Sequence, residues 1–223
     1  KMKEIGLEFF DQMEIHNTRD KAAHGRYADH IYKRLQRKGF LREDCLDLLI
    51  KERNVFGACM VSLKEADAMI CGLNRSYAVT LESVEYVLDP IPNKRVLGLT
   101  VMICNGRTIF VSDTNVHDMP NGSELADITE QSAQVVREIF DIEPKAALLS
   151  YSNFGKPFTE RSAFIRDALK ILDNRDVDFE YDGEMAANVA LNESLLALYP
   201  FCKLSSPANL LIMPAIHSAS IST

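Results

Sequence analysis

The sequence predicts an α/β fold in which a mainly parallel sheet is flanked by helices in three layers. The prediction rests on three short apolar runs that each end abruptly in a loop of small polar residues, with helix-like segments between them. These runs are 146–150, 177–181 and 209–213. Such runs are typical of buried parallel strands, whose carboxyl ends meet at one edge of the sheet, where open α/β sheets bind their ligands.

The first 65 residues are helical in pattern and contain no proline. A helix is predicted over 20–38, because apolar side chains recur there at helical spacing and Gly39 supplies a stop. Its apolar stripe consists of Ala23, Tyr27, Ala28, Ile31 and Leu35. The segments that follow are predicted to be helices at 44–52 and 55–64, a short buried strand at 67–71 closed by Gly72, and a helix at 78–88 stopped by Pro90.

An antiparallel hairpin is predicted where the runs 96–104 and 108–111 are joined by Asn105-Gly106. Asn-Gly is the strongest short hairpin signal, because both residues tolerate the positive φ angles of the turn. The change from helices to alternating strands and helices places a domain boundary near 90–93. Residues 1–92 are then the helical part of a first subdomain, and residues 93–223 form a second α/β subdomain.

Two amphipathic helices are predicted to cover the sheet. The first begins at a Ser123 cap and ends at Phe140, and the second begins at a Thr159 cap and ends near Leu172. A weaker helical region spans 184–198. The inward faces consist of Leu125, Ile128, Ser132, Val135 and Ile139 in the first helix, and of Phe164, Ala168, Leu169 and Leu172 in the second.

The overall composition is that of a soluble globular protein, with 47% hydrophobic residues and a net charge of −7. An acidic chain is a poor nucleic-acid binder, because phosphates require a basic face. No apolar stretch approaches the length of a membrane span and no signal peptide is present, so we expect no membrane contact and a cytoplasmic location. Five cysteines without a CxxC pair indicate free thiols, and Cys59, Cys71 and Cys104 lie in apolar runs that predict burial.

Several common chemical motifs are absent from the sequence. There is no Walker loop, no GxGxxG that opens a helix, and no HExxH or clustered set of histidine, cysteine and carboxylate residues. We therefore expect no dinucleotide site and no metal site in this chain. A cysteine–histidine nucleophile pair stays open, although nothing in the pattern selects one.

Polar loops at the predicted strand ends are the candidate site. Ser150-Tyr-Ser-Asn-Phe-Gly155 offers hydroxyl and amide groups, and its glycine permits close backbone approach, although a structural turn gives the same pattern. Asp182-Gly-Glu184 is either part of the site or a helix N-cap, and Asp113-Thr-Asn115 is a third short polar loop. We expect one shared crevice, with Ser150, Ser152, Asn153 and Asp182 around it and Leu148, Leu149, Leu211 and Ile212 packed between helices.

Five motifs occur in order along nearly the whole chain. They are Cys71-Gly72 after Glu65-Ala-Asp67-Ala, then Asp113-Thr-Asn115, Ala147–Gly155, Asp182-Gly-Glu-Met185 and Ala208–Pro214. Together these motifs resemble the phosphate acetyl/butyryl transferase family. They resemble most the variant of this domain that is fused behind the catalytic domains of bacterial NADP-dependent malic enzymes, because the loop contains Ser-Asn-Phe-Gly and the next motif Asp-Gly-Glu-Met.

The resemblance implies a fold of two α/β subdomains, like that of isocitrate and isopropylmalate dehydrogenases, around a cleft for coenzyme A and acetyl phosphate. It also implies homodimers or higher homo-oligomers. Both ends of the chain read as cut, and the family's segment with catalytic serine and arginine would lie beyond Thr223. The residues implied for an acetyl-CoA cleft are Thr114, Ser150, Ser152, Asn153, Gly155, Asp182, Gly183, Pro214, His217 and Ser218, with no catalytic residue among them.

Departures from the family pattern bear on activity. Active transferases carry an arginine in a Thr-x-Arg-Pro setting, where this chain has Glu82, and a carboxylate repels the phosphate that a guanidinium binds. A second family arginine falls at Leu35, which leaves Arg34 or Arg37 as substitutes at other angles of the helix. The resemblance therefore implies an allosteric acetyl-CoA sensor without transferase activity, with NADP and a divalent metal only in an upstream catalytic domain of the same chain.

Two alternatives stay open at this point. One is an active phosphate acetyltransferase, which converts acetyl-CoA and phosphate to CoA and acetyl phosphate. The other is an assembly module that only holds subunits together.

Overall fold

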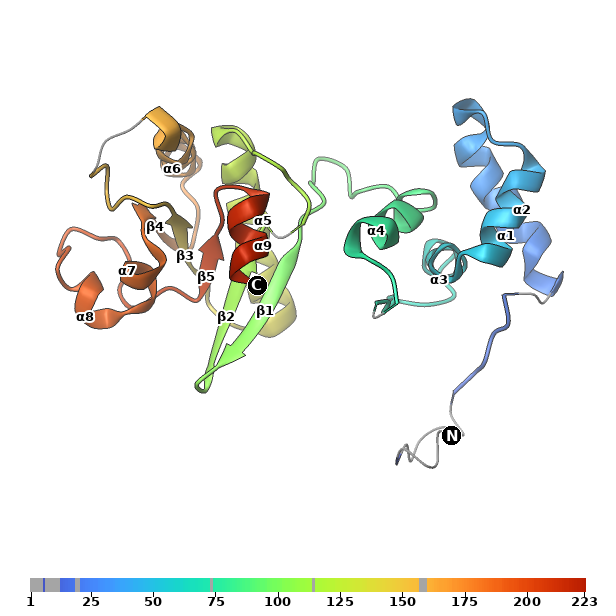
Figure 1. Cartoon of the computed structure of the whole chain (residues 1–223), viewed down its shortest axis with the longest axis horizontal. Coiled ribbons are helices and arrows are strands. Elements are labelled where there is room, and N and C mark those ends of the chain that lie inside the picture. The colour runs from blue at the N-terminus through green and yellow to red at the C-terminus, as the bar shows by residue number, and fades with distance from the viewer. Residues whose placement is uncertain (1–5, 7–12, 19–20, 73, 114, 157–159) are drawn as a thin grey trace. The chain divides into compact units, whose positions relative to one another are not determined.

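The computed structural model describes residues 6, 13–18, 21–72, 74–113, 115–156 and 160–223, without the side chains of 21–23 and 161 (Figure 1). The chain divides into two compact units, Lys1–Asp89 and Pro90–Thr223. Each unit has its own hydrophobic core, and each is described by itself.

In its described residues, unit 1 is helical. Its helices are α1 (Lys21–Leu35), the short 3₁₀ helix η3 (Gln36–Lys38), α2 (Arg42–Lys51), α3 (Arg53–Ser62) and α4 (Tyr77–Glu85). The predicted stripe of α1 is confirmed where its side chains are described, because Tyr27, Ala28, Ile31 and Leu35 are buried against α2 and α3. Gly39 ends this region at φ +89°, a conformation that glycine adopts without strain.

The predicted buried strand at 67–71 is wrong. This segment has no regular structure, and both Ile70 and Cys71 are exposed. The described part of unit 1 contains no strand, so the backbone of this segment has no partner for a β ladder. Its short apolar sequence is compatible with a strand, but a strand needs a neighbour to satisfy its N–H and C=O groups.

Unit 2 contains a five-stranded sheet in the order β1-β2-β5-β3-β4 (Figure 1). The strands are β1 (Leu99–Cys104), β2 (Arg107–Ser112), β3 (Lys145–Leu149), β4 (Glu180–Met185) and β5 (Leu210–Ile212). β1 and β2 form the predicted antiparallel hairpin, in which Asn105 and Gly106 adopt φ angles of 50° and 73°. The pairs β2–β5, β5–β3 and β3–β4 are parallel. The predicted α/β class with a mainly parallel sheet is confirmed.

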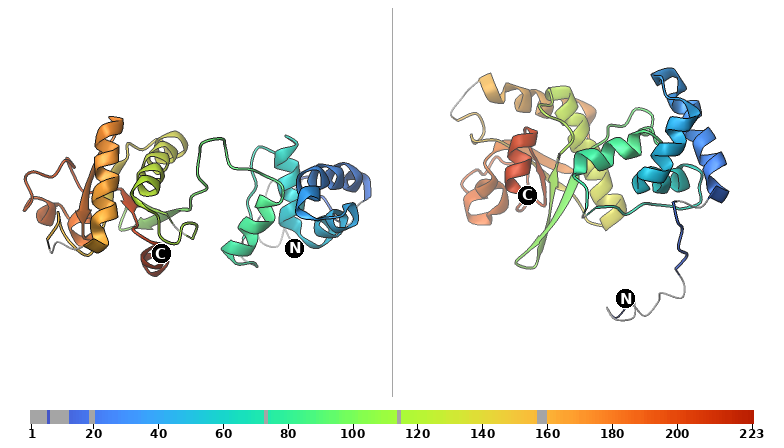
Figure 2. Two further views of the ribbon diagram at one scale, coloured as in Figure 1. Left: turned by 90° about the horizontal axis from the view of Figure 1, so that it is seen from above. Right: turned by 45° about the vertical axis from the view of Figure 1, so that its right-hand side comes forward.

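Helices cover both faces of this sheet (Figure 2). On one face lie α5 (Gly122–Phe140) and α6 (Ala163–Arg175), the latter preceded by the short η4 (Glu160–Ser162). On the other face lie α7 (Ala187–Leu191), α8 (Glu193–Leu196) and α9 (Ile216–Ser222).

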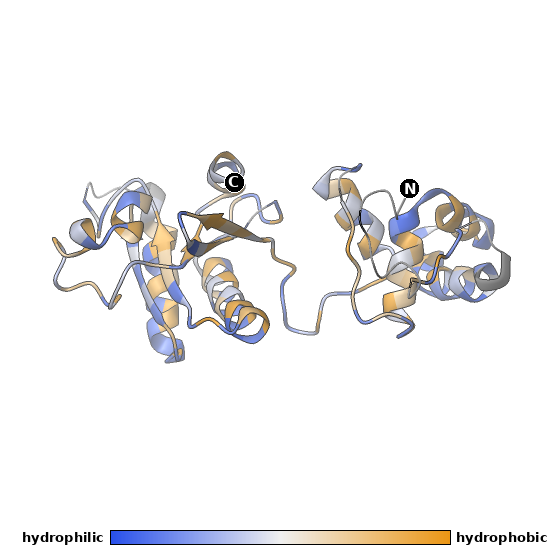
Figure 3. Cartoon of the chain, turned by 90° about the horizontal axis from the view of Figure 1, so that it is seen from below, coloured by the Kyte–Doolittle hydropathy of each residue, from blue (hydrophilic) through white to orange (hydrophobic). Residues whose placement is uncertain are grey.

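Successive side chains along each strand point to opposite faces of the sheet, as the pleat of a β-strand requires. Leu148 and Ile212 pack toward α5 and α6, and Leu149 and Leu211 pack toward the opposite helices. The prediction that these four residues are buried between helices is confirmed. Hydrophobic positions along the strands are orange in Figure 3, and hydrophilic positions recur in blue along the helices.

The helix α5 is capped by Asn121 and not by Ser123. The side chain of Asn121 accepts a hydrogen bond from the Glu124 N–H at 3.0 Å, and the Glu124 carboxylate accepts one from the Asn121 N–H at 2.9 Å. This reciprocal pair is a capping box, which satisfies two otherwise free backbone donors. Leu125, Ile128 and Ser132 of the predicted inward face are buried, but Ile139 in the last turn of the helix is exposed to solvent. The predicted Thr159 cap lies outside the described residues.

The predicted strand at 177–181 is displaced toward the C-terminus, because β4 runs from Glu180 to Met185. Asp182-Gly-Glu184 is therefore strand and not loop. Gly183 makes this pairing possible, since a Cβ atom at this position would lie 2.7 Å from the carbonyl oxygen of Leu148 on β3.

Two of the three cysteines expected to be buried are exposed. Cys59 is buried, and desolvation raises the pKa of its thiol to about 12. Cys71 lies in the irregular segment of unit 1, and Cys104 ends the edge strand β1. Within the described parts of the chain, no helix combines the length and the apolar character needed to cross a bilayer.

Candidate ligand site at the carboxyl edge of the sheet

The parallel strands of unit 2 direct their following loops to one edge of the sheet. Residues 112, 212 and 148 lie at matching positions of β2, β5 and β3 in the hydrogen-bonded register. The segments that begin at Asp113, Met213 and Ser150 therefore leave the sheet together. The backbone joins two of these segments, because the Ile216 N–H donates to the carbonyl oxygen of Asp118 at 3.1 Å.

A cavity of about 380 Å³ opens at this edge, above the ends of β3 and β5. None of the described residues that line it carries a charge. It is bounded by the loop after β3, the first turn of α6, the start of α7, and α9 with the residues before it. The lining residues are Leu149, Ser150, Tyr151, Phe164, Ile165, Ala187, Met213, Pro214, Ser218 and Ser222.

Three of the residues selected from the sequence line this cavity, namely Ser150, Pro214 and Ser218. The Ser150 N–H donates to the Met185 carbonyl at 2.9 Å, which ties the loop to the end of β4. The Ser150 hydroxyl lies 3.3 Å from that of Ser152, and the Ser218 hydroxyl donates to the Ala215 carbonyl at 2.7 Å. The cavity is thus apolar with a few hydroxyl groups at its wall, which is the usual character of a small-molecule site.

A buried polar network lies behind the cavity wall and centres on Glu184, whose side chain has an exposed fraction of 0%. Its Oε1 accepts from the Ser152 hydroxyl at 2.6 Å and from the Ser162 hydroxyl at 3.1 Å. Nη1 of Arg166 lies 3.1 Å from both carboxylate oxygens and donates to the Ser162 hydroxyl at 2.9 Å. A buried charge is tolerated only when it is paired and hydrogen-bonded, and this network meets both conditions.

The remaining residues of the loop after β3 have structural partners. Asn153 Oδ1 accepts from the Ala186 N–H at 2.8 Å, and the backbone groups of Asn153 and Lys156 bond each other in both directions. Phe154 and Gly155 complete this tight turn with φ angles of 51° and 83°. Asn153 and Gly155 therefore shape the loop and do not line the cavity. Ser152 is also buried beneath the loop.

Asp182 and Gly183 lie within β4 and do not line the cavity. Asp182 accepts hydrogen bonds from the N–H groups of Gly183 at 2.8 Å and Lys203 at 2.7 Å, so its carboxylate fastens the segment before β5. His217 is exposed on α9. Thr114 lies outside the described residues.

Asp113 fastens the loop after β2. Its buried carboxylate accepts from the Gly98 N–H at 2.6 Å and the His117 N–H at 2.9 Å, and it contacts Nδ1 of the His117 ring. Asp113 of the predicted polar loop therefore has a structural role. Within the described residues, no group of three or more histidine, cysteine or carboxylate side chains could hold a metal ion.

The sequence pattern did not indicate most of the apolar wall, nor that Ser152 and Glu184 of the selected motifs form a buried network with Ser162 and Arg166. Tyr151 and Met213 lie within the motifs selected, but apolar residues at strand ends are ordinary core residues by pattern. Glu184 carried a usable signal, because a charge in a strand that is otherwise buried requires a partner. The identity of that partner, Arg166, could not be inferred from spacing.

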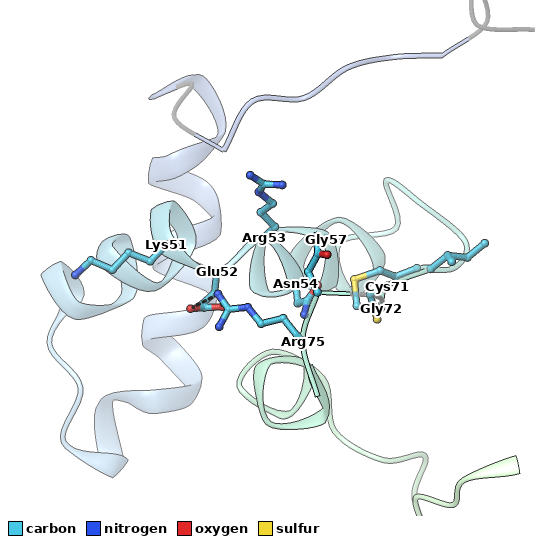
Figure 4. Close-up of a pocket in the computed structure, with 11 residues that line it drawn as sticks. Lys51, Glu52, Arg53, Asn54, Gly57, Cys71, Gly72 and Arg75 are labelled. Atoms are coloured by element: carbon cyan, nitrogen blue, oxygen red, sulfur yellow. Dashed lines mark hydrogen bonds and ion pairs between the residues drawn. The ribbon is translucent and has the colours of Figure 1, made fainter. Parts of the chain in front are cut away.

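A second cavity of about 540 Å³ lies in unit 1 between the start of α3 and the segment before α4 (Figure 4). It is larger and more polar than the first cavity, and none of the predicted site residues that the structure describes lines it. In Figure 4 the Arg75 guanidinium points to Glu52, and its Nη2 lies 3.0 Å from a carboxylate oxygen. Lys51 pairs with Asp47, which lies outside the cavity lining, at 2.7 Å. Two of its cations are therefore already paired with carboxylates.

The residues at the family's anchor positions also lie in unit 1. Glu82 is exposed on α4 and accepts from the Tyr86 hydroxyl at 2.9 Å, a hydrogen bond that raises the pKa of Tyr86. Arg34 makes a bidentate contact with Asp89, at 2.5 and 2.8 Å, and a 3.3 Å hydrogen bond to the Tyr86 carbonyl. Position 82 thus presents a carboxylate, and Arg34 is held by another acid.

Comparison with known proteins identifies the family. The profile described as Phosphate acetyl/butaryl transferase matches residues 1–223. An NADP-dependent malic enzyme of Rhizobium meliloti is 52% identical over 211 residues, which is 95% of this chain and 28% of the relative. The NADP-dependent malic enzyme of Escherichia coli is 36% identical over 97% of this chain and 28% of the relative. A phosphate acetyltransferase of Helicobacter pylori is 26% identical over 95% of this chain and 41% of the relative.

Solved structures show the same fold. The EutD phosphotransacetylase from Staphylococcus aureus has a TM-score of 0.81 at 21% identity, over 99% of this chain and 68% of that chain. The chain spans less than a third of the length of the malic enzymes it matches. It belongs to the phosphate acetyl/butyryl transferase family, and its sequence resembles the segment of that family found in malic enzymes.

Proposed function

We propose that this member of the family is the regulatory, phosphate-acetyltransferase-like domain of an NADP-dependent malic enzyme, which binds acetyl-CoA and does not transfer acetyl groups. The observation that carries the proposal is the cavity of about 380 Å³ at the carboxyl edge of the sheet, whose described lining residues are all uncharged. Its position is where open α/β folds bind ligands, and its apolar wall with hydroxyl groups suits the acetylated pantetheine arm of the cofactor.

The remainder of the proposed enzyme supplies the chemistry of malate oxidation. The identity of 52% to a malic enzyme, against 26% to a phosphate acetyltransferase, supports this parent. NADP and a divalent metal would then be bound by a catalytic domain elsewhere in the same chain. Acetyl-CoA would act by binding one conformation of the enzyme more tightly than another, which is the requirement for any allosteric ligand.

Acetyl-CoA is expected to raise the melting temperature of the isolated chain. At a concentration 100 times the dissociation constant, a ligand that binds only the native state adds about 2.7 kcal/mol, which corresponds to a shift of roughly 5–10 °C for a chain of this size. Thermal shifts with acetyl-CoA, CoA, NADP and malate, measured side by side, test the proposal. A shift with NADP and none with acetyl-CoA would contradict it.

A matched pair of variants locates the binding. Ser150→Leu places a larger side chain in the cavity wall and should reduce the acetyl-CoA shift. Ser194→Leu makes the same change at an exposed position of α8, away from the cavity, and should leave the shift unchanged. Equal shifts in both variants would place the ligand elsewhere.

We also propose that the chain forms a homodimer. Large apolar side chains are exposed on unit 2, among them Ile103, Ile139 and Phe201, and symmetric pairing is the common way to bury such surface. Light scattering at tens of micromolar should give twice the 25.1 kDa of the chain. A mass of 25.1 kDa would contradict the dimer, and a mass that doubles only with acetyl-CoA would link assembly to sensing.

A further inference from the structure

We propose that the buried ion pair of Glu184 and Arg166 positions the loop 150–156 and thereby sets the affinity of the cavity for acetyl-CoA. The inference rests on the proposed function, because it concerns the same cavity. It assigns a role to residues that do not line the cavity and that would not touch a ligand there.

Three segments of the cavity wall meet at the Glu184 carboxylate. Ser152 belongs to the loop that contributes Ser150 and Tyr151 to the wall. Ser162 and Arg166 frame the first turn of α6, which contributes Phe164 and Ile165. Glu184 itself lies near the end of β4, three residues before Ala187 of the wall.

Glu184 also holds the loop 150–156 through its backbone carbonyl group. The Phe154 N–H donates to the Glu184 carbonyl oxygen at 2.6 Å. The side-chain oxygen of Asn153 accepts a hydrogen bond from the Ala186 N–H. Because the Ser150 N–H also donates to the Met185 carbonyl at 2.9 Å, the loop is attached to the end of β4 on both sides of Ser152. The Ser152 hydroxyl attaches the loop to the Glu184 carboxylate itself, so a substitution of Ser152 removes this attachment and leaves the others in place.

Burial makes this attachment specific. The Glu184 side chain has an exposed fraction of 0% and that of Arg166 has 22%. Water cannot replace a lost partner at the buried carboxylate without a rearrangement, so the carboxylate keeps its donors in one geometry. A fixed Ser152 then fixes the backbone of Ser150 and Tyr151 on the wall. A preformed wall binds more tightly, because the ligand does not have to order it.

Ser152→Ala and Ser162→Ala form a matched pair. Both serines are buried to 1% exposure, and both hydroxyls donate to the same oxygen of Glu184. Ser152 lies on the cavity loop and Ser162 precedes α6. We expect both variants to melt a few degrees below the parent. We expect the dissociation constant for acetyl-CoA to rise by about tenfold in Ser152→Ala and by less than about twofold in Ser162→Ala.

Hydrogen exchange of residues 150–156 without ligand supplies a readout that a general loss of stability does not move. Ser152→Ala should speed exchange in this loop more than Ser162→Ala does. Ser152→Thr keeps the hydroxyl and should restore both affinity and protection. If Ser152→Ala does not fold, Ser152→Cys, which has nearly the same shape and a weak donor, takes its place.

The outcomes separate this inference from the proposed function. Equal affinity and equal loop exchange in the two alanine variants would overturn the positioning role, while acetyl-CoA binding by the parent chain would still stand. If the parent chain binds no acetyl-CoA, the proposed function fails, and the exchange comparison still decides whether Glu184 holds the loop.

Discussion

Replacing Arg166 with leucine is expected to lower the free energy of unfolding of unit 2 by about 3–5 kcal/mol, because it leaves a buried carboxylate without its cation. The Glu184 side chain has no exposed surface, and Arg166 donates to both of its oxygens at 3.1 Å. The hydroxyls of Ser152 and Ser162 would remain as partners, but neither carries a compensating charge. Most of the expected loss in unfolding free energy therefore comes from the unpaired buried charge, and less of it from the number of hydrogen bonds removed.

Arg137→Leu is the matched control. Arg137 is likewise bound to carboxylates, since it donates to Glu143 at 2.7 and 3.2 Å and to Asp178 at 2.9 and 3.0 Å. Its side chain is 36% exposed, however, and that of Asp178 is 81% exposed. Solvent screens such pairs and hydrates the carboxylates once the arginine is gone, so the control should lose far less stability.

Urea unfolding followed by circular dichroism measures both variants against the parent chain. Equal losses for the two arginines would show that the Glu184 network is no more sensitive than a surface ion pair. The double variant Arg166→Leu with Glu184→Leu should recover part of the loss, because it removes the stranded charge together with its partner.

The sheet was predictable where a strand is apolar on both faces. The runs near 146–150 and 209–213 became β3 and β5, because a buried parallel strand cannot hold polar side chains without partners. The hairpin was predictable from Asn105-Gly106 between two apolar runs, since turn chemistry is local. The segment at 67–71 has the same kind of sequence and forms no strand, because pairing depends on a neighbour that the local sequence does not contain.

β4 shows the other limit of the sequence. Asp182 and Glu184 resemble loop residues, yet both lie in a strand whose charges are satisfied from elsewhere. Lys203 supplies its backbone N–H to Asp182 from 21 residues away, and Arg166 reaches Glu184 from 18 residues away. Such partners depend on the tertiary fold, so the spacing of residues cannot reveal them.

The candidate site also contains residues that could be predicted from the sequence and residues that could not. Ser150, Pro214 and Ser218 were found because they follow predicted strands, and the position of a strand end is a property of the topology. Ser152 and Asn153 come from the same loop but turn toward the protein interior or its backbone. The direction of each side chain follows from the tight turn at 153–156, which a list of polar residues does not specify.

The full-length enzyme proposed above should not make acetyl-CoA from acetyl phosphate and CoA at a rate within tenfold of a typical turnover of about 10 s⁻¹. The reason is the charge at position 82, where Glu82 presents a carboxylate and holds the Tyr86 hydroxyl at 2.9 Å. Arg34, a candidate substitute for the second family arginine, is bound by Asp89 in a bidentate pair. A phosphate dianion that approaches this helix meets repulsion where transfer requires a guanidinium.

Two substitutions on α4 test this reason as well as the absence of activity. Glu82→Arg supplies the cation at the family's position, and Glu85→Arg makes the same change of charge one turn away on the same exposed helix. A coupled assay with acetyl phosphate and CoA should detect any gain in Glu82→Arg above Glu85→Arg, because a transition-state contact depends on position and not on net charge. Turnover of the unchanged enzyme near 10 s⁻¹ would establish an active transferase, and equal gains in both variants would mean that only the long-range field had changed.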